Sequence, residues 1–190
     1  MTKRCIDLAL AVGLLPVLAL FTLALALLNP LLNPGPVFFV QPRMGRDCRS
    51  FPAFKFRTMR NTGQRPRGPD SPLETDRIPR IGHALRRTRI DEIPQIINIL
   101  RGEMSLIGPR PDFFGHARTY MRAIPEYRDR HRVRPGLSGL AQVELGYAVG
   151  IEATRAKAQM DLKYIQEAGF KMDTWLLWRT LVVILGGQGR

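Results

Sequence analysis

The sequence predicts an α+β fold that is mostly helical with short β-strands. It also predicts a re-entrant membrane helix at the N-terminus and amphipathic helices at the membrane interface. Three observations support this prediction: a long apolar run opens the chain, the strand-forming runs that follow it are short, and apolar residues at helical spacing recur further along. The 190 residues suffice for one ordinary domain with its own core.

The apolar run covers residues 6–28, in which only Asp7 and Thr22 are clearly polar. A run of this length can cross a hydrocarbon layer of about 30 Å as a helix. A cleavable signal peptide is the alternative, but no small-residue cleavage site follows the run. We therefore expect a membrane helix that stays on the protein.

Two features of this run favour a helix that enters the bilayer and returns to the same face. Pro16 lacks an N–H donor and its ring clashes with the carbonyl of Val12, so it predicts a break that leaves halves of about 18 Å, too short to span. Basic residues on both sides of the run conflict with the positive-inside rule. These are Lys3, Arg4, Arg43, Arg46 and Arg49. A kinked but spanning helix is the alternative, because membrane helices tolerate proline.

Short strands are expected after this anchor. Residues 29–36 are typical of a turn, and residues 37–40 form a short β-branched and aromatic run. Residues 54–59 alternate apolar with basic side chains, which predicts a half-buried strand with Lys55 and Arg57 on one face.

The middle of the chain predicts a loop and two helices. Glycines and prolines among charges indicate a mobile loop over residues 61–79, followed by a basic helix over residues 80–89. Apolar spacing then predicts a helix that starts near Pro94, since proline is tolerated only at a helix start, and ends at Gly102.

The last third predicts helices joined by a turn. Residues 120–127 are expected to be partly helical, residues 134–136 to form a turn, and residues 152–168 to form a longer helix that ends at Gly169. A final helix carries an apolar stripe of Trp175, Trp178, Leu181, Val182 and Leu185. The stripe fits either a protein core or the headgroup layer of a membrane.

The charge balance predicts an anionic partner. Lysine and arginine number 29 against 16 acids, a formal charge of +13, which suits nucleic acid, phospholipid headgroups or a phosphorylated substrate. Cys5 and Cys48 show neither a metal spacing nor a disulfide framework, which favours a reducing compartment. The histidines show no triad or metal spacing. They are His83, His116 and His131.

Asp91 and Glu92 are the candidate chemical centre. Acids at a helix start often only cap the helix, and that interpretation stays open here. However, arginines lie on both sides of the pair, and a carboxylate that attacks phosphorus needs such cations to remain ionised beside its anionic target. Arginine also grips phosphate oxygens bidentately, and a second acid can hold Mg²⁺.

The surroundings of this pair resemble a known family. The string over residues 85–111, LRRTRIDEIPQIINILRGEMSLIGPRP, closely resembles the core of the monotopic phosphoglycosyl transferases, also called bacterial sugar transferases. Further matching residues follow the family's order along nearly the whole chain. They are Lys3-Arg4 with Asp7, Pro16, Pro34 to Phe39 with Gln41, Arg43 and Gly45, Lys55 to Met59, Arg134 to Gly136, Ser138-Gly139, Ala141 to Val143, Asp161 and Tyr164-Ile165. The chain is most similar to the minimal, single-domain members.

The resemblance implies a two-step reaction. Asp91 would attack the β-phosphate of a UDP-sugar, release UMP and become a phosphosugar ester, which undecaprenyl phosphate would then attack. Glu92 would assist, and Mg²⁺ would be required, held by Asp91 and Glu92. Phosphates would be bound by Lys55, Arg57, Arg86, Arg110 and Arg134, with Asp161 as a supporting residue of the substrate site.

The resemblance also implies an organisation and a location. Residues 1–35 would form the re-entrant anchor and residues 36–190 the catalytic domain, as one structural unit on the cytoplasmic face of a bacterial inner membrane. Membrane lipids would be partners, and a homodimer is left open. Two positions depart from the family pattern: Leu15 precedes Pro16 and Arg89 lies two residues before the aspartate, both where serine is common.

Two other functions fit parts of the sequence. A nucleic-acid-binding protein would explain the arginines at 128, 130, 132 and 134, but no aromatic residues are interleaved with them and the apolar N-terminus has no role there, so no nucleic acid is expected. A non-catalytic basic scaffold that binds anionic lipid is the second alternative. The identity of the sugar and of the glycan pathway is not determined by the sequence.

Overall fold

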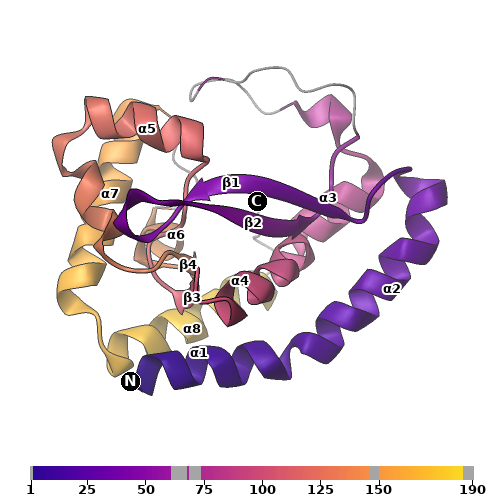
Figure 1. Cartoon of the computed structure of the whole chain (residues 1–190), viewed down its shortest axis with the longest axis horizontal. Coiled ribbons are helices and arrows are strands. Elements are labelled where there is room, and N and C mark those ends of the chain that lie inside the picture. Colours follow the sequence, from indigo (N-terminus) through magenta and orange to yellow (C-terminus); the bar gives the residue numbers. More distant parts are fainter. Residues whose placement is uncertain (1, 61–67, 69–73, 146–149, 186–190) are drawn as a thin grey trace.

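The computed structural model of the chain describes residues 2–60, 68, 74–145 and 150–185. Helices dominate, and the described strands form two small two-stranded sheets. Figure 1 shows a hairpin across the middle of the molecule, with helices around it. The predicted fold class, mostly helical with short strands, is confirmed.

The apolar N-terminal run forms two helices, α1 (Thr2–Gly13) and α2 (Leu15–Leu32), which meet at an angle along one edge of the molecule (Figure 1). The break lies just before Pro16, which occupies the first turn of α2, where a helix needs no N–H donor. The predicted interruption is therefore confirmed. The predicted turn over 29–36 is wrong in its first half, because α2 continues through an exposed Pro30 and Asn33 N–H donates to Asn29 O at 3.0 Å to complete the last turn.

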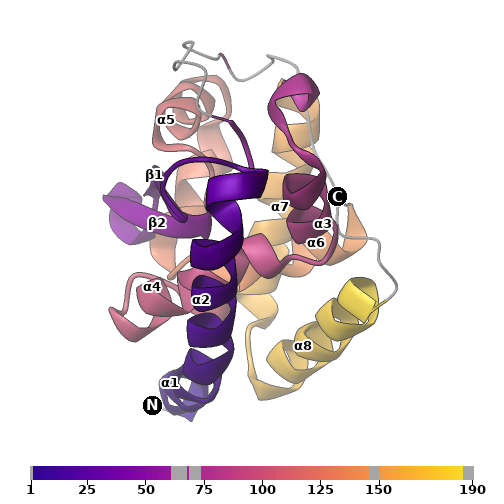
Figure 2. The ribbon, with the colours of Figure 1, turned by 90° about the vertical axis from the view of Figure 1, so that its right-hand side faces the viewer.

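Most of this run faces outward. Thr2–Leu32 covers 31 residues with a mean hydropathy of 2.6 in its most apolar part, of which only 17% is buried, so by length and composition it could cross a membrane. The side chains that enter the core are few: Ala11, Leu18 and Leu25. Figure 2 shows α1 and α2 as a column on the outside of the body.

Asp7 explains how a charged residue fits into this apolar run. Its side chain is 4% exposed, and its carboxylate accepts hydrogen bonds from Ser105 Oγ at 2.8 Å and from the Leu106 amide at 3.0 Å. Both donors belong to strand β3 (Ser105–Ile107). A membrane-type helix is thereby joined to the body by a buried polar contact.

The central hairpin consists of β1 (Phe38–Met44) and β2 (Ser50–Phe56), paired antiparallel from Phe38 opposite Phe56 to Met44 opposite Ser50. Both strands extend beyond their predicted limits towards the connecting turn η1 (Arg46–Cys48). The sequence concealed this because Pro42 and Pro52 lie opposite each other. In a two-stranded sheet every strand is an edge strand, and an edge strand accepts proline.

The segment after β2 leads to the acidic pair. The predicted basic helix is α3 (Arg80–Arg87), and the next helix begins earlier than predicted, as the 3-10 helix η3 (Ile90–Gln95) continued by α4 (Ile96–Leu100). Gly102, with φ of 80°, ends it as expected. Of the predicted loop over 61–79, residues 75–77 form the short helix η2 (Thr75–Arg77), and most of the remainder lies outside the described residues.

A second, parallel sheet pairs β3 with β4 (Gly136–Ser138). The sequence predicted only a turn at 134–136, but Gly136 begins a strand. A Cβ at Gly136 would overlap the backbone of Gly108, so only glycine permits this close approach. The pairing brings the segment after β3 against the segment that precedes α6 (Leu140–Glu144).

The remaining helices surround these sheets. Helix α5 (Phe114–Ala123) starts before the predicted 120–127 and the 3-10 helix η4 (Pro125–Arg132) ends after it, whereas α7 (Ile151–Glu167) agrees with its prediction. In the final helix, α8 (Phe170–Leu185), Leu176 is fully buried while Trp175, Trp178 and Leu181 are 40–65% exposed. The stripe residues with a described exposure, Trp175, Trp178, Leu181 and Val182, therefore do not pack in the core.

Candidate active site

Asp91 and Glu92 lie in the first turn of η3, against the hairpin strand β2. Arg89, just before η3, has a φ of 58°, a left-handed conformation that costs a non-glycine residue on the order of 1 kcal/mol and is concentrated at functional sites. Both carboxylates are buried, at 7% and 6% exposure. A strained turn thus presents two adjacent acids in a region of low exposure.

Glu92 is held tightly by cations. Lys55 Nζ lies 2.7 Å from its Oε1, and Arg110 donates from both terminal nitrogens, with Nη1 3.0 Å from Oε2. Arg89 adds a contact at 3.7 Å. Burial alone would raise the pKa of Glu92, but Arg110 and Lys55 outweigh it and hold that pKa well below its ordinary value. Glu92 is therefore a stable anion.

Asp91 is held loosely. Its only ion pair among the described residues is with Lys55 Nζ, at 4.0 Å from Oδ2, and no side-chain hydrogen bond to its carboxylate is found in that part of the chain. Burial, with the neighbouring charge of Glu92, raises the pKa of Asp91 despite Lys55 and Arg86. A carboxylate that is both more basic than usual and unoccupied by donors is suited to attack an electrophile or to bind a cation.

The site has an excess of positive charge. Four cations, Lys55, Arg86, Arg89 and Arg110, act on the two carboxylates, which leaves a formal charge of +2. Lys55 is buried enough that its pKa is lowered, with Arg110 and Arg43 contributing to the effect. Arg86 Nε donates to Thr58 Oγ1 at 2.9 Å, which fixes this arginine beside the pair. Such a site favours an anion, phosphate oxygens above all.

The structure thus brings together five of the eight residues expected at the site. These are Lys55, Arg86, Asp91, Glu92 and Arg110. The other three engage elsewhere. Arg57 is 8% exposed and donates to Pro36 O at 2.7 Å and to Asn33 at the end of α2, and the exposed Arg134 donates to Gly102 O at 2.8 Å. Asp161 is 1% exposed and forms an ion pair of 2.6 Å with Arg130.

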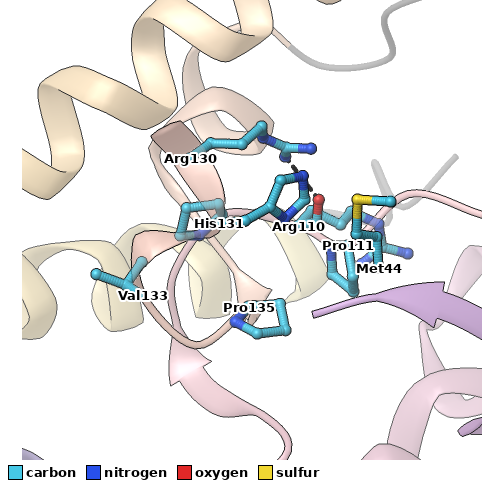
Figure 3. A pocket seen from close by; sticks show the side chains of 8 residues that line it. Met44, Arg110, Pro111, Arg130, His131, Val133 and Pro135 are labelled. Atoms are coloured by element: carbon cyan, nitrogen blue, oxygen red, sulfur yellow. Dashed lines mark hydrogen bonds between the residues drawn. The ribbon is translucent and has the colours of Figure 1, made fainter. Parts of the chain in front are cut away.

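Arg130 is the most important residue that the sequence did not identify. It was grouped with neighbouring arginines as a possible nucleic-acid surface, yet it is 1% exposed and forms ion pairs with Asp112 and Asp161. Figure 3 shows it above Arg110, at a small pocket whose lining also includes His131. The available signal was Tyr127, three residues earlier and thus on the same helical face.

A magnesium ion fits this site only if water and substrate phosphates supply most of its ligands. No group of three or more metal-binding side chains occurs among the described residues, and the acids available are Asp91 and Glu92. Mg²⁺ is commonly held by one or two carboxylates with water and substrate phosphates, so two acids suffice chemically. Because Glu92 is already paired with two cations, Asp91 is the carboxylate that is open to a metal.

Comparisons with known proteins all identify one family. The family model described as bacterial sugar transferase matches residues 1–187. The chain is 42% identical to UDP-N-acetylgalactosamine-undecaprenyl-phosphate N-acetylgalactosaminephosphotransferase of Aeromonas hydrophila, over 98% of this chain and 44% of the relative. It is 40% identical to UDP-glucose:undecaprenyl-phosphate glucose-1-phosphate transferase of Caulobacter vibrioides, over 96% of this chain and 67% of that protein.

A shorter relative is covered more fully. The exopolysaccharide production protein PSS of Rhizobium leguminosarum bv. phaseoli is 40% identical, over 95% of this chain and 93% of its own length. The chain therefore spans less than half of the first relative, two thirds of the second and nearly all of the third.

Proposed function

This chain belongs to the bacterial sugar transferase family, and from that premise we propose that it transfers a sugar 1-phosphate from a UDP-sugar to undecaprenyl phosphate. The reaction would be the first membrane step of a glycoconjugate pathway, such as one for exopolysaccharide, O-antigen or glycoprotein. The names of the relatives support both substrates, since two of them are UDP-sugar:undecaprenyl-phosphate transferases.

The unequal state of the two acids is the observation that carries this proposal. Asp91 Oδ attacks the β-phosphorus of the donor, the bond from that phosphorus to the bridging oxygen breaks, and UMP leaves with the electron pair. A phosphate oxygen of undecaprenyl phosphate then attacks the aspartyl phosphosugar, which frees the Asp91 carboxylate and gives the lipid-linked diphosphosugar. The loosely held, more basic Asp91 suits the nucleophile, and the tightly paired Glu92 does not.

The surrounding cations have a defined role in this scheme. Lys55, Arg86 and Arg110 would bind the donor's phosphate oxygens and offset the charge that develops in the transition state. Arg57, Arg134 and Asp161 would support the site through the backbone and ion-pair contacts described above. Mg²⁺, held by Asp91 with Glu92 nearby, would supply further charge neutralisation on the phosphates.

The anchor suits a lipid acceptor. We propose that α1 and α2 form a re-entrant helix pair on the cytoplasmic face of the inner membrane, and that the exposed tryptophans of α8 lie in the headgroup layer. The outward apolar surface and the bend before Pro16 support this arrangement. The phosphate of undecaprenyl phosphate would then lie at the level of the site.

UMP release from a panel of UDP-sugars tests the proposal. The full chain, in detergent with undecaprenyl phosphate and Mg²⁺, is compared with Asp91→Asn, Glu92→Gln and the matched control Asp173→Asn, whose carboxylate pairs with Lys3 instead. We expect one or a few sugars to give UMP, Asp91→Asn to lower the rate by at least about 10³-fold, and Asp173→Asn to retain activity.

Two results would contradict this assignment. If Asp91→Asn keeps wild-type activity, the nucleophile is another group. If no sugar yields UMP while the folded protein still binds anionic lipid, the non-catalytic scaffold becomes the better interpretation.

A further inference from the structure

We propose that Arg130, a residue with no contact to the acidic pair, positions Arg110 for the reaction by holding its backbone. The inference rests on the proposed function and extends it to a buried residue. Arg110 is the arginine that grips Glu92, so the placement of its side chain determines the geometry of the pair.

All five N–H donors of Arg130 are used. Nε donates to Asp161 Oδ2 at 2.8 Å, Nη1 donates to Asp112 Oδ2 at 2.6 Å and to Tyr127 Oη at 3.0 Å, and Nη2 lies 2.6 Å from Asp161 Oδ2. The fifth bond runs from Nη2 to the carbonyl oxygen of Arg110, at 2.7 Å. Figure 3 shows this bond between the two arginines. One of the five donors of this buried guanidinium thus bonds the backbone of Arg110, a residue of the site.

The same segment is held at each neighbouring carbonyl. Gly136 N–H donates to Pro109 O, and Met44 N–H donates to Asp112 O, both at 3.0 Å. Arg43 Nη1 donates to the carbonyl oxygen of Pro111 at 3.0 Å. Four consecutive carbonyls, from residue 109 to residue 112, therefore each accept a bond, and the donors come from β1, η4 and β4. The bond to the Arg110 carbonyl comes from a buried ion-pair network.

The network is well suited to a fixed role. Arg130 and Lys157 face Asp112 and Asp161, so the formal charges cancel, and Lys157 Nζ lies 2.6 Å from Asp112 Oδ1. Because a balanced and buried network is rigid, the Arg110 carbonyl has a stiff support. Only arginine offers a planar fork with five donors, so lysine at 130 would keep the charge and lose most of these bonds.

Hydrogen exchange tests the positioning without relying on activity. In the full chain in detergent, Arg130→Lys should speed exchange of the Met44 and Gly136 amides by about 10-fold or more, while amides of α7 that lie away from Asp161 keep their rates. Tyr164→Phe is the control, because it removes hydroxyl contacts to Lys3, to Asp173 and to the Ile107 carbonyl that do not involve Arg110. Unchanged exchange at Met44 and Gly136 would overturn the proposal.

A double-mutant cycle tests the functional consequence. Arg130→Lys should lower the kcat of UMP release about 10-fold in the wild-type chain, but less than about 3-fold when Arg110 is already lysine, because both changes disturb one unit. Tyr164→Phe should give the same small effect in both backgrounds. Equal losses from Arg130→Lys in the two backgrounds would overturn the proposal. If the wild-type chain releases no UMP, the proposed function fails, and the exchange result alone decides whether Arg130 positions Arg110.

Discussion

Two charged clusters in this molecule are built from similar residues and differ in balance. The cluster around Asp91 and Glu92 has an excess of cations and one loosely held carboxylate, whereas the cluster around Arg130 pairs two cations with two acids at close range. Each cluster has one carboxyl whose pKa burial raises, Asp91 or Asp161, and one whose pKa nearby cations lower, Glu92 or Asp112. The two raised acids differ in their bonding, because Asp161 Oδ2 lies 2.6 Å from Arg130 Nη2 whereas Asp91 Oδ2 lies 4.0 Å from Lys55 Nζ. The unbalanced cluster can therefore bind and react, whereas the balanced cluster supports it.

Removing one charge from the charge-neutral Arg130 cluster should lower the stability of the fold most. Asp161→Asn leaves the Arg130 guanidinium, 1% exposed, with one anionic partner fewer. Removing one partner of a buried pair costs about 3 kcal/mol, or about 10 °C in Tm for a chain of this size. Thermal unfolding monitored by circular dichroism in detergent would measure it. Asp47→Asn, at an exposed surface pair, should change Tm by less than about 1 °C. A similarly small change for Asp161→Asn would show that the cluster is not a structural support.

Acid should destabilise the same cluster through His131. Burial, followed by the charge of Arg130, lowers the pKa of this imidazole to about 4, against the opposing charge of Asp112. As pH falls from about 6.5 to 4, His131 binds a proton in the unfolded chain but not in the folded chain. The free energy of unfolding therefore falls across that window, by about 2 kcal/mol between pH 7 and 5. His131→Asn should reduce the fall in Tm between these pH values, and His83→Asn, at an exposed position, should not. Equal pH dependence in both variants would contradict the prediction.

The smallest expected effect has the opposite sign. Because the pKa of Asp91 is raised, its charged form is disfavoured in the fold, and this cost is present above the folded pKa and disappears as pH falls through it. Asp91→Asn should therefore raise Tm at pH 7.5, by about 1 kcal/mol or about 3 °C, while it removes activity. Differential scanning fluorimetry of the two proteins would measure this. A drop in Tm as large as that expected for Asp161→Asn would remove the distinction between the clusters.

The parts of the molecule that depend on local sequence were predictable. The break at Pro16, the helix over 151–167 and the acidic pair follow from proline geometry, apolar spacing and neighbouring charges. The extent of the hairpin was not predictable, because Pro42 and Pro52 indicate a strand end unless the strand is known to be an edge strand.

Residues whose roles depend on distant partners were also missed. Arg57, which the resemblance assigns to a phosphate, donates to Asn33 and Pro36, and Arg130, which was not identified as a site residue, pairs with Asp161, 31 positions away. The sequence does not show which acid or carbonyl a basic side chain will contact in the fold. Lys55 was predicted at the site from the family motif and the strand alternation, and the structure places it against Glu92.

The bond from Asp7 to β3 has a consequence for protein engineering. Deleting the apolar N-terminus to obtain a water-soluble form would remove the carboxylate that satisfies the Ser105 hydroxyl and the Leu106 amide, both in the interior of the body. Both donors would then depend on water, and the core residues that pack against Ala11, Leu18 and Leu25 would be exposed. A solubilised version therefore needs its outward leucines replaced by polar residues while Asp7 and the face of α1 around it are kept.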